Sequence, residues 1–247
     1  DPILWSPESP RLYKLTAEIM SGKTILDSAS RDFGMRKIDI DGKYLRLNNQ
    51  PIYLMGAMDP MDTPDKNVYL PTYHARTDQE IKHEVMLAKK LGLNCIRKHF
   101  YIDDHRYMYW ADRLGLLVYG QPPCYRRITP SSIRRWRQQL EGWVRRDRTH
   151  PSLLMWTLFN ASHGLVPLPT TYEPGEVYQG ETPSPEEQAA MVKVAHDLVK
   201  RLDPTRPVMD TSGGRLFNSE IHSLMMYGFS GPQNYWRSRQ LYPGLRA

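Results

Sequence analysis

The spacing of hydrophobic and polar positions changes near residue 40, which indicates two different architectures in one chain. Residues 12–19 alternate in part between apolar and polar side chains, Ser21-Gly22-Lys23 has the composition of a turn, and residues 24–33 can return as a partner strand. Two or three strands cannot bury a core alone. Residues 1–40 are therefore predicted to be strands of a β domain that needs further strands.

From about Asp41 onward, short apolar runs alternate with longer segments of helical period. This alternation predicts a parallel sheet or barrel. Residues 44–47, a turn at Asn48-Asn49-Gln50 and residues 51–56 are expected to lead into the first strand. The other strands are expected at residues 94–97, 116–119, 153–158, 207–210 and 221–227. An eight-stranded barrel needs two more strand–helix units than these provide.

Helix starts and stops are marked by capping residues. Helices are expected to begin near Thr77, at Asp103 or Asp104, at Thr129-Pro130 and at Ser184-Pro185, and Gly92 and Gly115 are expected to end the first two. The last two helices carry apolar stripes at helical spacing. These stripes are formed by Ile133, Trp136, Leu140, Trp143 and Val144, and by Met191, Val194, Ala195, Leu198 and Leu202.

Composition places the chain among ordinary globular proteins. Its 247 residues are 40% hydrophobic and 24% charged, and no apolar run approaches the length of about 18 residues that a membrane span needs. The N-terminus has neither a basic start nor an apolar core, so no signal peptide is visible. The sequence leaves both a periplasmic or secreted location and a cytoplasmic one open.

The net charge of +6 raises the question of nucleic-acid binding. The basic residues concentrate in residues 126–148, where an apolar stripe occupies one helix face and arginines occupy the others. A solvated outer helix face explains this pattern without a nucleic-acid partner, and no binding motif supports the alternative. We therefore expect no nucleic-acid partner and no membrane partner.

Cysteine and histidine spacing argues against a disulfide framework and against a metal site. Cys95 lies in an apolar strand pattern and Cys124 in a Pro-rich segment, so both are expected to be free thiols. His99, Asp103, Asp104 and His105 form a loose group whose spacing matches no common zinc pattern. We therefore expect no metal.

Polar residues follow the predicted strands at their carboxyl ends, where the active sites of such barrels gather. Loops are polar in any case, so this pattern alone is ambiguous. The residues concerned are Asp59, Arg97-Lys98-His99, Gln121, Asn160-Ala161, Ser212 and Tyr227.

Several segments together resemble the retaining β-glycosidases of glycoside hydrolase family 2. They occur in the family's order from Trp5 to about Trp236, and each would be weak alone. The segments are residues 47–51, 93–99, 111–118, 147–152, 203–207 and 212–214, followed by His222. The resemblance implies a (β/α)8 TIM barrel over residues 41–247, incomplete at its C-terminus, after the last strands of an immunoglobulin-like β-sandwich in residues 1–40.

The resemblance also implies a catalytic position that this chain fills unexpectedly. In the family, His-Pro-Ser leads into a strand that ends in Asn-Glu, and this Glu is the general acid/base. Here His150-Pro151-Ser152 and Asn160 match, but Ala161 stands where the Glu is expected. The nucleophile is expected after a seventh strand, beyond Ala247, and Glu220 is interpreted as structural.

Further residues are assigned to substrate binding by the same resemblance. Asn160 matches the family Asn that contacts the sugar 2-hydroxyl. The other expected sugar contacts are Asp59, Arg97, His99, His222 and Tyr227. The family implies an exo-acting enzyme that uses no metal or organic cofactor and takes a carbohydrate substrate, with β-galactoside and β-glucuronide as the leading candidates. Whether the protein forms a homo-oligomer stays open.

Two alternatives come from other classes of protein. A non-catalytic carbohydrate-binding relative would carry Ala161 naturally, whereas an engineered Glu→Ala change would leave the same sequence. Asp210-Thr211-Ser212-Gly213-Gly214 also echoes a trypsin-like protease signature, but Thr211 breaks its register, and alternating strands and helices contradict a double β-barrel.

Overall fold

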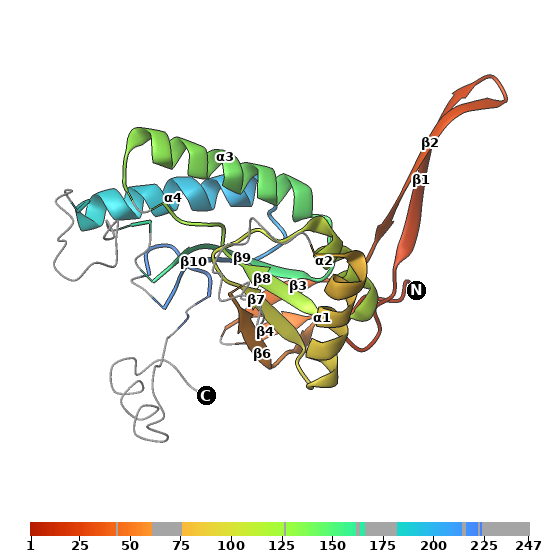
Figure 1. The fold of residues 1–247 in the computed structure, drawn as a ribbon, viewed down its shortest axis with the longest axis horizontal. Helices are drawn as coiled ribbons and strands as arrows, with labels where there is room; N and C mark the ends of the chain where they lie inside the picture. The colour runs from red at the N-terminus through yellow and green to blue at the C-terminus, as the bar shows by residue number, and fades with distance from the viewer. Residues whose placement is uncertain are drawn as a thin grey trace.

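The computed structural model describes residues 1–42, 44–60, 76–125, 127–161, 164–165, 182–213, 216–221 and 223. Within these ranges the centre is a five-stranded parallel sheet in the order β10-β9-β8-β7-β6 (Figure 1). Its strands are β6 (Gly56–Asp59), β7 (Cys95–Lys98), β8 (Leu117–Gly120), β9 (Leu153–Asn160) and β10 (Val208–Ser212). Neighbours in sequence are neighbours in the sheet, as in successive units of a TIM barrel.

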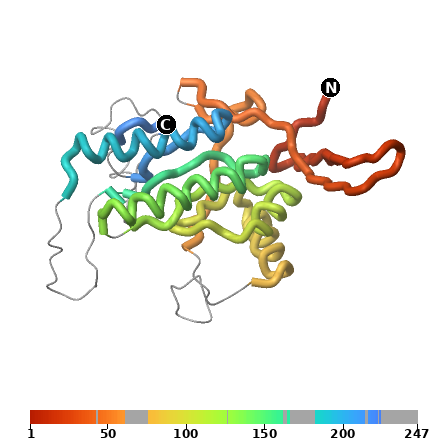
Figure 2. The backbone as a smooth tube through the Cα atoms, turned by 90° about the horizontal axis from the view of Figure 1, so that it is seen from above, coloured from red at the N-terminus to blue at the C-terminus, as the bar shows by residue number. Residues whose placement is uncertain are grey.

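Four helices follow the first four strands of this sheet and bury their apolar faces on it. They are α1 (Asp78–Lys90), α2 (His105–Leu114), α3 (Pro130–Asp147) and α4 (Pro185–Leu202), and Figure 2 shows α3 and α4 lying side by side. The predicted starts are confirmed: Thr77 and Ser184 form capping boxes with Glu80 and Glu187, and Asp104 caps α2.

Alternate residues of the strands pack into two different cores. Ile96 and Val118 face the helices in a cluster with residues from all four of them. Cys95 and Leu117 face the other way. They pack with three residues that precede the barrel strands, Trp5, Ile38 and Leu47. Adjacent residues of a strand point to opposite faces of the sheet, and here both faces are buried. This explains why the strands have nearly continuous apolar runs.

The predicted turn after residues 44–47 is confirmed, but these residues do not lead directly into the first barrel strand. Residues 38–51 form a separate antiparallel sheet of β3 (Ile38–Asp41), β4 (Tyr44–Leu47) and β5 (Gln50–Pro51), and the barrel strand begins only at Gly56. The predicted turn falls at Asn48 and Asn49, whose φ values of 54° and 67° turn the chain back on itself, so that β5 pairs with β4. Asn tolerates this left-handed region better than most residues do.

The N-terminal hairpin consists of β1 (Tyr13–Ser21) and β2 (Thr24–Phe33), which pair antiparallel as predicted. It projects away from the barrel strands (Figure 1), and Leu15, Ile19 and Leu26 are each more than 60% exposed. The hairpin therefore adds little to the core of the described residues.

Two other predictions differ from the structure or lie outside it. On α4 the buried residues are Val192, Ala195, Leu198 and Val199, whereas Val194 is 50% exposed, because the helix is rotated slightly from the expected stripe. The predicted strand at residues 221–227 lies almost entirely outside the described residues, as do His222 and Tyr227.

The His150-Pro151-Ser152 segment is an anchor at the start of β9, at the opposite end from Asn160. Asp112 accepts hydrogen bonds from the backbone and side chain of Ser152 and lies 2.6 Å from His150 Nδ1. Arg36 donates to the carbonyls of Pro151 and Leu153, and its burial, with Arg206 nearby, lowers its pKa to about 9. This segment thus ties residue 36 to the barrel sheet.

Gly115 offers a test of how α2 joins the N-terminal segment. It ends α2 with φ +74°, and a Cβ there would overlap the carbonyl oxygen of Pro7, whereas Gly92 has φ +80° and nothing within 4 Å. We expect Gly92→Ala to cost about 1–2 kcal/mol of unfolding free energy from the left-handed conformation alone. Gly115→Ala should cost about 1–3 kcal/mol more from the overlap. Urea unfolding of both variants checks this, and equal losses would contradict the close approach to Pro7.

Candidate active site

The carboxyl ends of the five parallel strands meet along one edge of the sheet, where barrel active sites lie. Asp59 is in register with Lys98, Lys98 with Gly120, and Asn160 with Ser212. The edge continues one residue further, because the Ala161 amide donates to the Ser212 carbonyl at 2.8 Å. Strand register therefore brings together residues that are far apart in the sequence.

Arg97 and Asn160 are in direct contact at this edge. The Arg97 guanidinium donates to Asn160 Oδ1 at 2.6 Å, and Asn160 is only 6% exposed. Hydrogen bonds from a charged donor are about twice as strong as neutral ones. The contact therefore fixes the Asn160 amide, with its oxygen toward Arg97 and its NH2 group turned away.

His99 joins the same group through Gln121, which the sequence predicted only as a strand-end residue. Gln121 Nε2 lies 2.9 Å from His99 Nδ1, and Gln121 Oε1 lies 3.3 Å and 3.4 Å from two nitrogens of Arg97. Three of the predicted substrate-binding residues, Arg97, His99 and Asn160, thus belong to one network. Gln121 is the residue that joins the other members of this network. The only signal for it in the sequence is its position directly after the third strand.

Ala161 follows Asn160 directly and has a left-handed backbone with φ 48°. This conformation costs a residue other than glycine about 1–2 kcal/mol, so the surrounding structure must hold it. Its amide bond to Ser212 is one such restraint. A methyl side chain at this position neither donates nor accepts a proton.

Asp59 takes part in a different set of contacts. Its Oδ2 accepts from Lys98 Nζ at 2.5 Å and from the Tyr101 hydroxyl at 2.6 Å. Lys98 is 3% exposed, lies 2.8 Å from Asp103, and its ammonium sits 3.2 Å from the centre of the Tyr107 ring. Burial alone would lower the pKa of Lys98, but Tyr107 and the two carboxylates outweigh it, so the net shift is upward.

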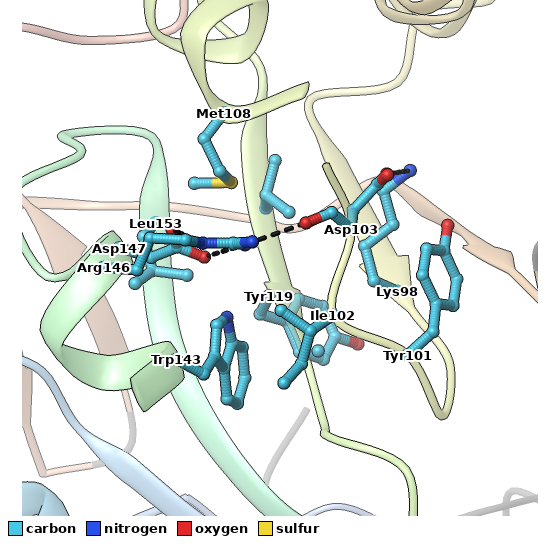
Figure 3. Close-up of a pocket in the computed structure, with 12 residues that line it drawn as sticks. Lys98, Tyr101, Ile102, Asp103, Met108, Tyr119, Trp143, Arg146, Asp147 and Leu153 are labelled. Carbon is cyan, nitrogen blue, oxygen red and sulfur yellow. Dashed lines mark hydrogen bonds and ion pairs between the residues drawn. The ribbon is translucent and has the colours of Figure 1, made fainter. Parts of the chain in front are cut away.

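A small cavity adjoins this ionic cluster on the helix side of the sheet, as Figure 3 shows. It measures about 20 Å³ and lies among Lys98, Tyr101, Asp103, Trp143 and Arg146, whose guanidinium donates to the Asp103 carbonyl at 2.8 Å. That volume suits one water molecule. It is far too small for a sugar ring, so the cavity belongs to the packing behind the site.

Two carboxylates near the strand ends, Asp59 and Asp103, are both engaged by Lys98, and neither lies in the network of Arg97 and Asn160. Glu220 lies at the opposite end of the barrel, where its carboxylate accepts from the Val208 amide at 3.2 Å and lies 3.0 Å from Lys200 Nζ. Since Val208 begins β10, this is the amino end of the strand, as predicted. Glu220 therefore ties α4 to β10 and is remote from Asn160.

The His, Cys, Asp and Glu side chains of the described residues do not form a metal-binding group, and the two thiols are protonated. No group of three or more His, Cys, Asp or Glu side chains in it could hold a metal ion. Burial raises the pKa of the Cys124 thiol and of the Cys95 thiol, each to about 12. Both are therefore protonated at neutral pH, and a thiol is a poor nucleophile in that form. Among the described helices, none has the length and apolar character of a membrane span.

Comparison with known proteins agrees with this geometry. The profile for the TIM barrel domain of glycosyl hydrolases family 2 matches residues 38–234, and the general profile of the same family matches residues 1–36. The chain belongs to glycosyl hydrolase family 2. The described residues have the parallel sheet that a TIM barrel requires, with helices packed on one face and the N-terminal segment packed on the other.

Individual relatives are named for two activities. The chain is 24% identical over 97% of its length to a putative β-glucuronidase of Formosa agariphila, and 30% identical over 86% to a β-galactosidase of Aeromonas hydrophila. The structure of a Bacteroides uniformis β-glucuronidase superposes over 98% of the chain with a TM-score of 0.76 and 24% identity. The chain spans 24%, 19% and 30% of these three proteins.

Proposed function

We propose that this chain is part of a retaining exo-β-glycosidase in which position 161 is that of the general acid/base. The observation that carries this is the Asn160 side chain, buried and held by Arg97 at the carboxyl end of β9, with Ala161 as the next residue. This is where an acid/base at a barrel strand end would stand. Family membership supports a β-glycosidase; the assignment of position 161 is ours.

The retaining mechanism explains what Ala161 removes. It uses two carboxyl groups about 5–5.5 Å apart, one to protonate the leaving oxygen and one to attack the anomeric carbon. A methyl group at position 161 can do neither. The nucleophile expected after a seventh strand lies outside the 247 residues, in which no Asp or Glu follows Glu220. We infer that this chain is inactive as it stands.

The remaining residues of the site suit substrate binding. Arg97 fixes the Asn160 amide with its NH2 group turned away from the guanidinium, and this N–H donor can bind a sugar hydroxyl. His99 belongs to the same network through its contact with Gln121. The names of the relatives favour β-glucuronide or β-galactoside as the substrate class.

A non-catalytic carbohydrate-binding protein is the second candidate. The specific observation in its favour is the combination of Ala161 with the pairing of both strand-end carboxylates, Asp59 and Asp103, to the buried Lys98. Such a protein would keep the Arg97–Asn160 contact for binding. The codon at position 161 in the natural gene distinguishes a natural Ala from an engineered one.

A panel of chromogenic glycosides tests the proposed function. We expect the full-length protein carrying Ala161→Glu to hydrolyse β-linked substrates, with β-glucuronide and β-galactoside compared first. The matched control is Ala161→Gln, which has the size of Glu but cannot exchange a proton in this role. Turnover confined to α-linked substrates would refute the proposal, and binding without turnover in the Glu variant would favour the second candidate.

A further inference from the structure

Gln121 is held in place from both sides of its backbone. A Cβ at the preceding Gly120 would stand 2.6 Å from the Lys98 carbonyl oxygen, so only glycine lets β8 approach the end of β7 this closely. The Gln121 amide donates to the same carbonyl at 3.3 Å. Pro122 follows, and a residue before proline is confined to extended conformations. Gln121 itself is fully buried.

The direction of the Gln121 amide follows from its neighbours. A guanidinium only donates hydrogen bonds, so the oxygen of the Gln121 side chain must face Arg97, as it does at 3.3 Å and 3.4 Å. The NH2 group must then face His99, whose Nδ1 lies 2.9 Å away. His99 Nδ1 is therefore the acceptor of this hydrogen bond.

A neutral imidazole that accepts at Nδ1 carries its proton on Nε2. The same guanidinium sets the Asn160 amide, because it donates to Asn160 Oδ1 at 2.6 Å. One buried network of hydrogen bonds, in which the Arg97 cation can only donate, thus orients side chains at the ends of β7, β8 and β9. If the side chain at position 121 could no longer donate, the contact with His99 could persist, but His99 Nδ1 would have to be the donor.

We propose that Gln121 is a positioning residue that holds His99 in the Nε2-protonated form, within the same network that turns the N–H donor of the Asn160 amide toward a sugar oxygen. The part of this proposal that concerns the sugar rests on the proposed function. The part that concerns His99 does not, because it follows from the hydrogen bonds of the described residues alone.

Nitrogen NMR of ¹⁵N-labelled imidazoles tests the His99 part on the 247-residue chain. A ring nitrogen without a proton resonates far downfield of a protonated one, and loss of one resonance pair in His99→Asn assigns the signal among the eight histidines. We expect His99 to have an unprotonated Nδ1 and a protonated Nε2. A protonated Nδ1 at neutral pH would overturn the proposal. This result is read from the unchanged chain, so it does not depend on whether a variant at position 121 folds.

Gln121→Glu is the decisive variant, since it keeps the shape and the acceptor but removes the donor. We expect it to move a proton onto His99 Nδ1, while Gln138→Glu, the same change at an exposed position of α3, leaves His99 as it was. An unchanged His99 in Gln121→Glu, or the same change in Gln138→Glu, would overturn the proposal. Thermal melting of both variants establishes that they are folded.

An activity measurement tests the part that concerns the sugar. In the full-length Ala161→Glu protein, we expect Gln121→Glu to raise KM by about tenfold or more with a smaller change in kcat, because the new carboxylate competes with Asn160 Oδ1 for the Arg97 guanidinium and so disturbs the Asn160 amide. An unchanged KM would overturn the substrate-positioning role. If no variant hydrolyses any β-glycoside, the proposed function fails, and the NMR result still decides the role of Gln121.

Discussion

Restoring the carboxyl group at position 161 is expected to have the largest effect on activity. General acid/base assistance contributes typically about 10²–10⁴-fold, so Ala161→Glu in the full-length protein should raise kcat on unactivated β-glycosides by about that factor. The restored group must be protonated for the first step and ionised for the second, so the pH–rate profile should gain an acid and a basic limb. Steady-state kinetics of Ala161, Ala161→Gln and Ala161→Glu proteins from pH 4 to pH 9 measure both.

Two further measurements separate the role of position 161 from that of the nucleophile. Ala161→Glu in the 247-residue chain should recover nothing, because no carboxylate follows Glu220 and there is no route to a covalent intermediate. Azide should partly rescue the full-length Ala161 protein on substrates with good leaving groups, since it attacks a glycosyl-enzyme without base assistance. Normal hydrolysis of unactivated substrates by the Ala161 protein would show that another residue carries the proton and that position 161 is wrongly assigned.

The largest expected effect on stability is at Asp203, which lies between α4 and the start of β10. Its carboxylate accepts from Trp156 Nε1 at 2.9 Å and from Arg206 at 2.6 Å, and Asp203 and Arg206 are 3% and 4% exposed. Asp203→Asn leaves the Arg206 cation buried without its anionic partner. We expect a loss of about 3–5 kcal/mol in unfolding free energy, the usual cost of removing one member of a buried ion pair. Urea unfolding at pH 7 measures it.

The pH dependence of this loss follows from the pKa of Asp203. Burial alone would raise that pKa, but Arg206 and hydrogen bonds from Thr205 and Trp156 hold it below its ordinary value. A lowered pKa adds stability above the unfolded value of about 3.9 and loses it as the pH falls through the folded value. The difference between the parent and Asp203→Asn should therefore be constant from about pH 5 to pH 8 and shrink below about pH 4.

Asp197→Asn is the matched control for this experiment. Asp197 also has a lowered pKa, because Lys193 hydrogen bonds to it, but its side chain is 52% exposed. Exposed ion pairs contribute little to stability because water and salt screen them. We expect no measurable change in unfolding for this variant, and a loss equal to that of Asp203→Asn would show that charge alone, and not burial of the pair, explains the effect.

Local signals in the sequence determined the helices and most of the strands. Capping residues act over three or four positions, so Thr77, Asp104 and Ser184 could be placed without knowledge of the fold, and all three lie where expected. The apolar run at residues 153–158 predicted β9 because a strand covered on both faces has no polar side. The turn at Asn48 and Asn49 was also placed correctly, but apolar spacing does not report that the strands beside it pair with residues 38–41 in a separate sheet.

The candidate site was determined only in part by the sequence. Strand order placed Arg97, His99, Asn160 and Ala161 at one edge, but spacing along the chain carries no information on which side chains meet across strands. The tertiary structure decided that Arg97 contacts Asn160, that Gln121 joins Arg97 to His99, and that Asp59 pairs instead with Lys98. These contacts depend on the register between parallel strands, which long-range packing sets and which no local pattern of residues encodes.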